Sequence, residues 1–220
     1  SNTTHDVFTI AHELGHAMHS YYSHGAQPHS KANYSIFVAE VASTVNEVLL
    51  LKYMISHATD KKAKKYLLTY YLDMFRTTLF RQTMFAEFEK LSHDMAAKGL
   101  PLTPKSLSDK YYKLNKKYYG KAVTHDNLIR YEWARIPHFY SAFYVYKYST
   151  GITAAVNIAN AILTKGEAAV ADYKRFLKSG GSDSPYELLK IAGVDLMDKT
   201  PFNNAMGEFK ATLEQLKKEL

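Results

Sequence analysis

The stretch DVFTIAHELGHAMHSYY, residues 6–22, decides how the chain begins to fold, and at its centre lies the pentapeptide HELGH, residues 12–16. Apolar residues recur in this stretch at spacings of three and four, which is the period of an α-helix. Residues four apart on a helix share one face, so His12 and His16 can reach a single metal ion. Glu13 follows His12 directly and can contact a water on that ion instead of the ion itself. We therefore expect a helix that carries part of a zinc site.

The pentapeptide is the pattern used for zinc-assisted hydrolysis. Zinc lowers the pKa of water toward about 7, and a carboxylate in the position of Glu13 accepts the water's proton as the water attacks. The chain has 10 His among 220 residues, so a chance match is expected only about 0.02 times. Gly15 costs the helix about 1 kcal/mol relative to alanine, which implies that something approaches the backbone closely. The pattern predicts one Zn²⁺ per chain, with Glu13 as the catalytic base.

A catalytic zinc site takes three protein ligands, so a third one is needed. The chain has no cysteine, and His19 and Tyr22 stand where a metzincin would have glycine and histidine. Glu40 is the expected third ligand, because a carboxylate among apolar residues on a buried helix face needs a cation. Glu47 lies seven residues further on the same face. It would accept the free N–H of a ligand histidine, and the alternative is an exposed helix glutamate.

The rest of the chain also reads at the helical period, with breaks at short Gly or Pro stretches and almost no strand signal. We expect an all-α fold and a single catalytic domain over residues 1–220, with Thr103 as an N-cap before Pro104. The expected helices cover residues 6–22, 35–55, 60–97, 106–119, 140–163, 166–178, 185–191 and 201–220. Because the pentapeptide begins so early, we interpret the chain as a fragment whose upstream cleft wall is missing.

The charge and hydropathy patterns predict few partners. The formal net charge is +7, but the basic residues are scattered or form short clusters, as on a solvated helix face, so we expect no nucleic-acid partner. No apolar run approaches the roughly 18 residues that span a bilayer, and the start of the chain lacks the pattern of a signal peptide. We therefore expect a soluble protein without a membrane partner, and the absence of cysteine fits a reducing compartment.

Four blocks of the sequence resemble one family. Residues 3–22, residues 37–47, FRQTMFAEFE at residues 80–89 and WARIPHFYSAFYVYKYSTG at residues 133–151 are similar to the oligoendopeptidase F branch of the thimet oligopeptidase (M3) family of zinc metallopeptidases. The resemblance covers essentially the whole chain. It implies a two-lobed, mostly helical channel enzyme, of which this chain is the C-terminal, zinc-bearing lobe and the N-terminal portion is missing. It also implies a cytoplasmic bacterial endopeptidase that cleaves short peptides, with Glu40 as the third zinc ligand.

The resemblance further implies catalytic groups late in the chain. The family uses a histidine and tyrosines to bind the substrate and to stabilise the tetrahedral intermediate. His138 matches the histidine, and Tyr144 and Tyr148 are the best matches to the tyrosines, although this segment lacks the Gly-Gly of the thimet-like pattern. A phenol that donates to the developing oxyanion is worth roughly 3 to 4 kcal/mol. The alternative interpretation is an aromatic helix face.

Two other functions fit parts of the sequence. A zinc carboxypeptidase of related helical fold would need a group for the peptide's terminal carboxylate, and Arg135 and Lys147 are the local candidates. A noncatalytic zinc-stabilised binding module is the second alternative. Glu13 argues against it, because a structural site fills its fourth position and has no use for a general base.

Overall fold

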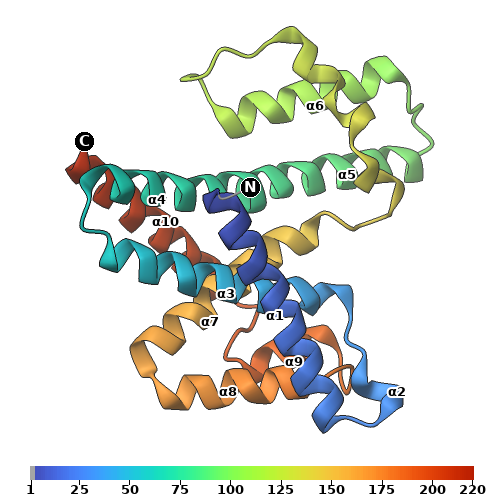
Figure 1. Ribbon diagram of the computed structural model, residues 1–220. Coiled ribbons are helices and arrows are strands. Elements are labelled where there is room, and N and C mark those ends of the chain that lie inside the picture. Colours follow the sequence, from blue (N-terminus) through green and yellow to red (C-terminus); the bar gives the residue numbers. More distant parts are fainter. Residues whose placement is uncertain (1–2) are drawn as a thin grey trace. The chain divides into compact units, whose positions relative to one another are not determined.

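The computed structural model describes residues 3–220, and every regular element in that range is helical (Figure 1). The α-helices are α1 (Thr4–Ala26), α2 (His29–Ala32), α3 (Ile36–His57), α4 (Lys61–Met74), α5 (Arg81–Ala97), α6 (Pro104–Tyr119), α7 (Tyr146–Lys165), α8 (Glu167–Lys178), α9 (Pro185–Ile191) and α10 (Thr200–Glu219). A π-helix, η1 (Phe75–Phe80), joins α4 to α5, and two 3₁₀-helices, η2 (Asn127–Arg135) and η3 (Pro137–Tyr140), precede α7. The predicted all-α fold is confirmed.

The chain divides into two compact units. The first contains the residues up to Phe75 together with Thr150–Leu220, and the second is Arg76–Ser149. The chain leaves the first unit within η1 and returns to it within α7. Each unit has its own apolar core. The single catalytic domain expected from the sequence stays a prediction.

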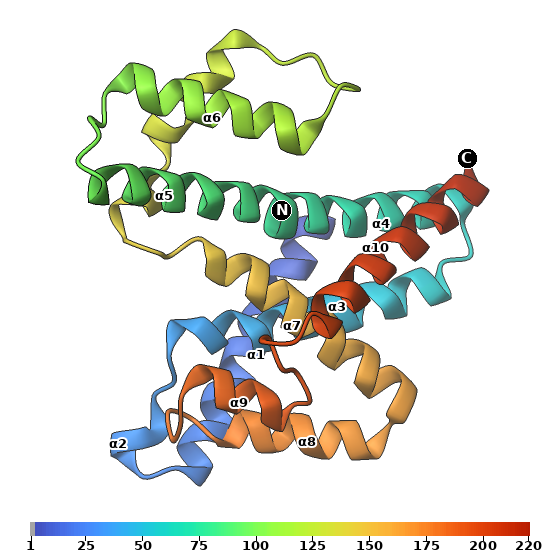
Figure 2. The ribbon, with the colours of Figure 1, turned by 180° about the vertical axis from the view of Figure 1, so that it is seen from behind.

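The first unit is built around α3, which contacts α1, α4 and α9. The side chains of Val38, Val41 and Val45 on α3 are fully buried, and they share a core with Ile158 of α7 and Phe176 of α8. Burying a valine side chain contributes roughly 1.5 to 3 kcal/mol. Helix α10 lies along α4, as Figure 2 shows from behind. Packing on several sides therefore fixes the helix that carries Glu40 and Glu47.

The second unit packs α5, α6 and η2 together. Its core contains Met84, Phe85, Phe88, Tyr111, Leu114, Ile136 and Val145. The buried carboxylate of Glu132 on η2 accepts hydrogen bonds from Arg81 at 2.7 Å, Tyr111 at 2.5 Å and Arg135 at 2.6 Å. Because Arg81 lies on α5 and Tyr111 on α6, this carboxylate fastens η2 to both helices.

Most helix ends follow the local sequence, and two predictions need correction. Thr103 caps α6 through Ser106, and Pro104 occupies the first turn, as predicted. The helix expected over residues 60–97 is interrupted by η1, whose wider turn has no sequence marker. The helix expected from residue 140 begins only at Tyr146, because Phe143 has a φ of 54°, which a right-handed helix cannot contain.

Candidate metal centre

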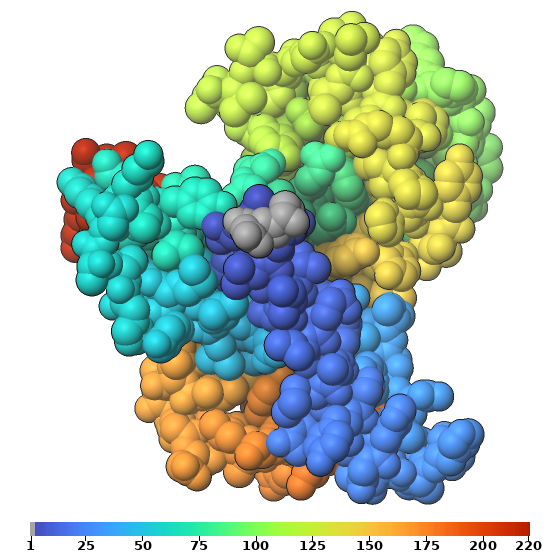
Figure 3. Space-filling view, in the orientation of Figure 1, coloured from blue at the N-terminus to red at the C-terminus, as the bar shows by residue number. Residues whose placement is uncertain are grey.

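Helix α1 crosses α3 at Gly15, where the two backbones nearly touch. A Cβ atom on Gly15 would lie 2.4 Å from the Cα of Ser43 and 2.8 Å from the carbonyl oxygen of Ala42. Only glycine permits this approach. The amide of Asn46 on α3 also donates to the carbonyl oxygen of Ala11 at 3.2 Å. Figure 3 shows α1 at the surface of the first unit. The crossing therefore brings α1 against the face of α3 that carries Glu40 and Glu47.

The crossing brings the three predicted metal ligands together. The Nε2 atom of His12 lies 3.3 Å from one oxygen of Glu40, and the Nε2 atom of His16 lies 4.0 Å from the other. The two imidazole rings have centroids 4.9 Å apart and are nearly perpendicular. One potential ligand atom from each of the three residues lies within 4.8 Å of the others, and all three side chains are half-buried. Two helices therefore aim three donor atoms at one point.

This donor set fits zinc. Two imidazole nitrogens and one carboxylate oxygen form a common catalytic zinc set, which leaves a fourth position open. Zinc bonds of about 2.0 to 2.1 Å in a tetrahedron place neighbouring ligand atoms about 3.3 Å apart, and His12 and Glu40 already have this separation. In the described residues 3–220, one group of three histidine and acidic side chains lies close enough together to share a metal ion, and it consists of His12, His16 and Glu40.

Glu47 contacts His12 at the ring nitrogen that does not face Glu40. Its Oε1 atom is 2.6 Å from Nδ1 of His12, which leaves Nε2 directed to Glu40. Hydrogen bonds to Glu40 and Glu47 raise the pKa of His12 to about 10, and the hydrogen bond from His12 lowers the pKa of Glu40. The site therefore favours a positive charge between its carboxylates, and a metal ion that takes this place must displace the proton on Nε2.

Two other side chains on α1, those of Glu13 and His19, differ in burial. Glu13 is exposed beside His12, and its side chain makes no hydrogen bond to another residue in the part of the chain that the structure describes. His19 is 1% exposed, and its ring stacks on Tyr34 with centroids 3.6 Å apart. Burial lowers the pKa of His19 to about 4. Glu13 is thus free to contact solvent or substrate, whereas His19 is a neutral packing residue outside the cluster.

The late candidates form a separate cluster in the second unit. The rings of His138 and Tyr144 stack at 5.6 Å, and both pack against Tyr148, whose hydroxyl lies 3.4 Å from Nε2 of His138. Arg135 and Lys147, the candidates for binding a peptide's terminal carboxylate, both contact other side chains of the protein. Arg135 donates to Glu132, and the ammonium of Lys147 lies 4.9 Å from the centre of the Tyr144 ring. The structure thus brings the histidine and both tyrosines together and pairs Arg135 with a carboxylate of its own unit.

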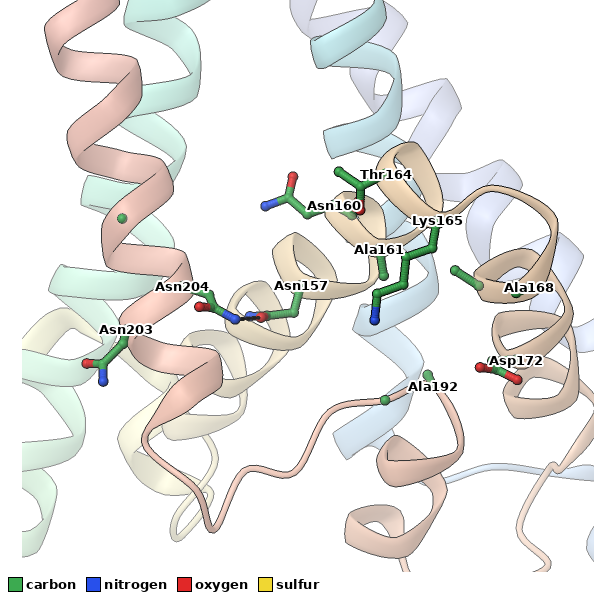
Figure 4. Close-up of a pocket in the computed structure, with 13 residues that line it drawn as sticks. Asn157, Asn160, Ala161, Thr164, Lys165, Ala168, Asp172, Ala192, Asn203 and Asn204 are labelled. Carbon is green, nitrogen blue, oxygen red and sulfur yellow. Dashed lines mark hydrogen bonds between the residues drawn. The ribbon is translucent and has the colours of Figure 1, made fainter.

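A polar hollow in the first unit lies between α7, α8 and α10 (Figure 4). It has a volume of about 560 Å³ and contains none of the predicted site residues. The amide of Asn204 donates to the side-chain oxygen of Asn157 at 2.9 Å, and Asn157 donates to the carbonyl oxygen of Pro201 at 2.8 Å. These amides fasten α10 to α7, so we assign them to the fold.

The contact at Gly15 can be tested by adding one methyl group. Gly15→Ala should destabilise the protein by about 1 to 3 kcal/mol, because the new Cβ meets the backbone of α3. It should also weaken zinc binding by pushing the two ligand helices apart. Gly207→Ala on α10 is the matched control, since nothing lies within 4 Å of its Cβ position, and a gain of up to about 1 kcal/mol is expected there. Unfolding and zinc titrations measure both effects, and an unchanged Gly15→Ala protein would contradict this account of the crossing.

Helix α1 with its HELGH sequence, packed against the glutamate-bearing helix α3, forms a cluster that could hold a metal ion. The chain belongs to Peptidase family M3, whose family model matches residues 3–208. The family predicted from the sequence is therefore confirmed. In the described residues 3–220, no helix is both long enough and apolar enough to cross a membrane.

Several bacterial relatives match nearly the whole chain. This chain is 48% identical over 219 residues to oligopeptidase PepF of Bacillus subtilis (strain 168), and the match covers 100% of this chain and 33% of that protein. It is 47% identical over 213 residues to an oligoendopeptidase F homolog of Borreliella burgdorferi, covering 97% of this chain and 36% of the relative. The crystal structure of oligoendopeptidase-F from Enterococcus faecium matches with a TM-score of 0.87 and 45% identity, over 97% of this chain and 39% of that one. The chain spans about a third of the length of these curated relatives.

Proposed function

We propose that this chain is the zinc-binding catalytic part of an endopeptidase that hydrolyses internal bonds of short oligopeptides. The observation that carries the proposal is the convergence of His12, His16 and Glu40 on one point beside the exposed Glu13. Membership of Peptidase family M3 and similarity to bacterial oligoendopeptidases give the same reaction class. The complete enzyme would include the remaining two thirds of its relatives' length and would act in the bacterial cytoplasm.

The proposed mechanism gives each side chain one task. Zinc would be held by His12, His16 and Glu40, and it would supply the Lewis acidity that polarises a peptide carbonyl and makes water acidic. Glu13 accepts the proton of the attacking water and delivers it to the leaving amine. Glu47 holds Nδ1 of His12, so that Nε2 keeps its direction.

His138, Tyr144 and Tyr148 would act on the substrate in this proposal. A phenol hydroxyl donates a hydrogen bond to the oxyanion as the carbonyl becomes tetrahedral, and an imidazole can bind the adjoining peptide group. The close packing of the three rings supports a shared role. The carboxypeptidase alternative is not favoured, since Arg135 is paired with Glu132.

Metal removal tests the proposal. Treating the full-length enzyme with a chelator should lower cleavage of an internally quenched peptide by more than about 100-fold, because the metal supplies several kcal/mol of charge stabilisation. Adding back Zn²⁺ should restore cleavage. A peptide with an amidated C-terminus should be cleaved as fast as the free acid. Full activity of metal-depleted enzyme would overturn the metallopeptidase assignment, and strict dependence on a free C-terminus would favour the carboxypeptidase.

A further inference from the structure

Glu89 has an unusual environment in the second unit. Its side chain on α5 is 4% exposed and sits beside Phe88 of the apolar core. Within residues 3–220, the carboxylate accepts one hydrogen bond, from the backbone N–H of Phe143 at 2.6 Å. Burying a carboxylate is costly, and a short charge-assisted bond recovers part of that cost. Such a carboxylate is therefore a strong acceptor for this one amide.

The residue that Glu89 holds has a strained backbone. Phe143 has a φ of 54°, and every other positive φ in the described chain belongs to a glycine. Its side chain is 49% exposed and contacts the ring of His93, with centroids 4.6 Å apart. A bulky residue in the left-handed region is unfavourable unless its surroundings impose the conformation. The bond from its N–H to Glu89 is a contact able to impose it.

The strained residue directly precedes Tyr144. The turn at Phe143 determines the direction in which the chain passes to Tyr144, and the next side chain, Val145, is fully buried in the core. The chain before this turn is also fastened to α5, because Glu132 of η2 forms an ion pair with Arg81. Thus α5 anchors both ends of residues 132–143, which carry His138 and directly precede Tyr144.

We propose that Glu89 is a positioning residue, which holds Phe143 in its left-handed conformation and thereby orients the Tyr144 hydroxyl for the oxyanion. This inference rests on the proposed peptidase function. Glu89 itself does not touch the substrate in this account. It acts on Tyr144 only by holding the backbone of Phe143.

Two substitutions of Glu89 in the full-length enzyme separate positioning from stability. Glu89→Gln keeps an acceptor oxygen at the same reach, so kcat should stay within about threefold of the parent. Glu89→Met removes the acceptor but fills the site with an apolar chain. It should lower kcat roughly 10- to 100-fold, as expected for loss of a hydrogen bond to a charged group. KM, zinc content and Tm should change little, and Tyr144→Phe should produce the same pattern.

Relief of the strain provides an independent check. Phe143→Gly adopts a positive φ without steric cost, so the double variant Glu89→Met with Phe143→Gly should regain about fivefold in kcat over Glu89→Met alone. Parent-like kcat in Glu89→Met, or equal losses in Glu89→Met and Glu89→Gln, would overturn the proposal. A drop in kcat that only follows a fall in Tm would also overturn it.

Hydrogen–deuterium exchange distinguishes failure of this inference from failure of the proposed function. Glu89→Met should speed amide exchange in residues 141–148 and leave α1 and α3 unchanged, whether or not the enzyme cleaves peptides. If the parent enzyme is inactive while exchange changes as expected, the peptidase proposal fails and the anchor at Phe143 stands. Unchanged exchange in residues 141–148 would refute the anchor itself.

Discussion

Replacing Glu13 with glutamine should reduce peptide cleavage by roughly 10²- to 10⁴-fold while zinc stays bound, as expected for loss of a general base. The amide keeps the shape of the carboxylate but cannot accept the water's proton. Glu13 is exposed and its side chain forms no hydrogen bond within the described chain, so the substitution should leave the contacts of His12 and Glu40 intact. The loss should therefore appear in kcat at unchanged zinc stoichiometry.

The matched control for this variant is Glu214→Gln. Glu214 is an exposed glutamate on α10 that pairs with Lys217, and exposed ion pairs of this kind contribute little to stability. Its substitution should change neither zinc content nor turnover. Steady-state kinetics and metal analysis of both variants make the test. Near-normal turnover by zinc-loaded Glu13→Gln protein would mean that another group accepts the proton.

Replacing Glu40 with alanine should weaken zinc binding much more than replacing Glu47. Glu40 approaches the Nε2 atoms of both histidines, whereas Glu47 contacts only the Nδ1 atom of His12. Loss of a carboxylate that holds a ligand histidine typically lowers metal affinity about 10- to 100-fold. Loss of a direct ligand removes a metal bond, so we expect a decrease of more than about 100-fold for Glu40→Ala.

Competition with a chromophoric chelator would measure both affinities. Glu187→Ala, at an exposed position on α9, is a control that should bind zinc like the parent. If Glu47→Ala instead binds zinc more weakly than Glu40→Ala, the two carboxylates have exchanged roles. Equal and small effects would show that the metal is held elsewhere.

The sequence predicted the features that depend on neighbours a few residues apart. The helical period of residues 6–22 placed His12 and His16 on one face, and the apolar surroundings of Glu40 singled it out on the next long helix. The all-α fold and the family could be read from such local patterns. The roles of these residues in binding zinc and in catalysis stay predictions.

Other features of the second unit have no signature in local sequence. The positive φ of Phe143 moves the start of α7 from the expected residue 140 to Tyr146. No glycine marks this turn. Its contact with Glu89, 54 residues earlier, is a hydrogen bond from the backbone N–H of Phe143, and local sequence does not reveal it. The π-helix η1 likewise interrupts a stretch whose apolar spacing predicts one unbroken helix.

The sequence alone thus determined most of the helices, the N-cap Thr103 and which side chains share a face, because these follow from a period of 3.6 residues and from short-range hydrogen bonds. Only the tertiary structure decided that Glu40 lies at Nε2 of His12 and Glu47 at Nδ1. Local pattern predicted Glu40 as a ligand and Glu47 as the partner of a ligand histidine, but both carboxylates share one face of α3, so it could not say which histidine Glu47 contacts. The crossing at Gly15, where a Cβ would meet the backbone of α3, sets that pairing.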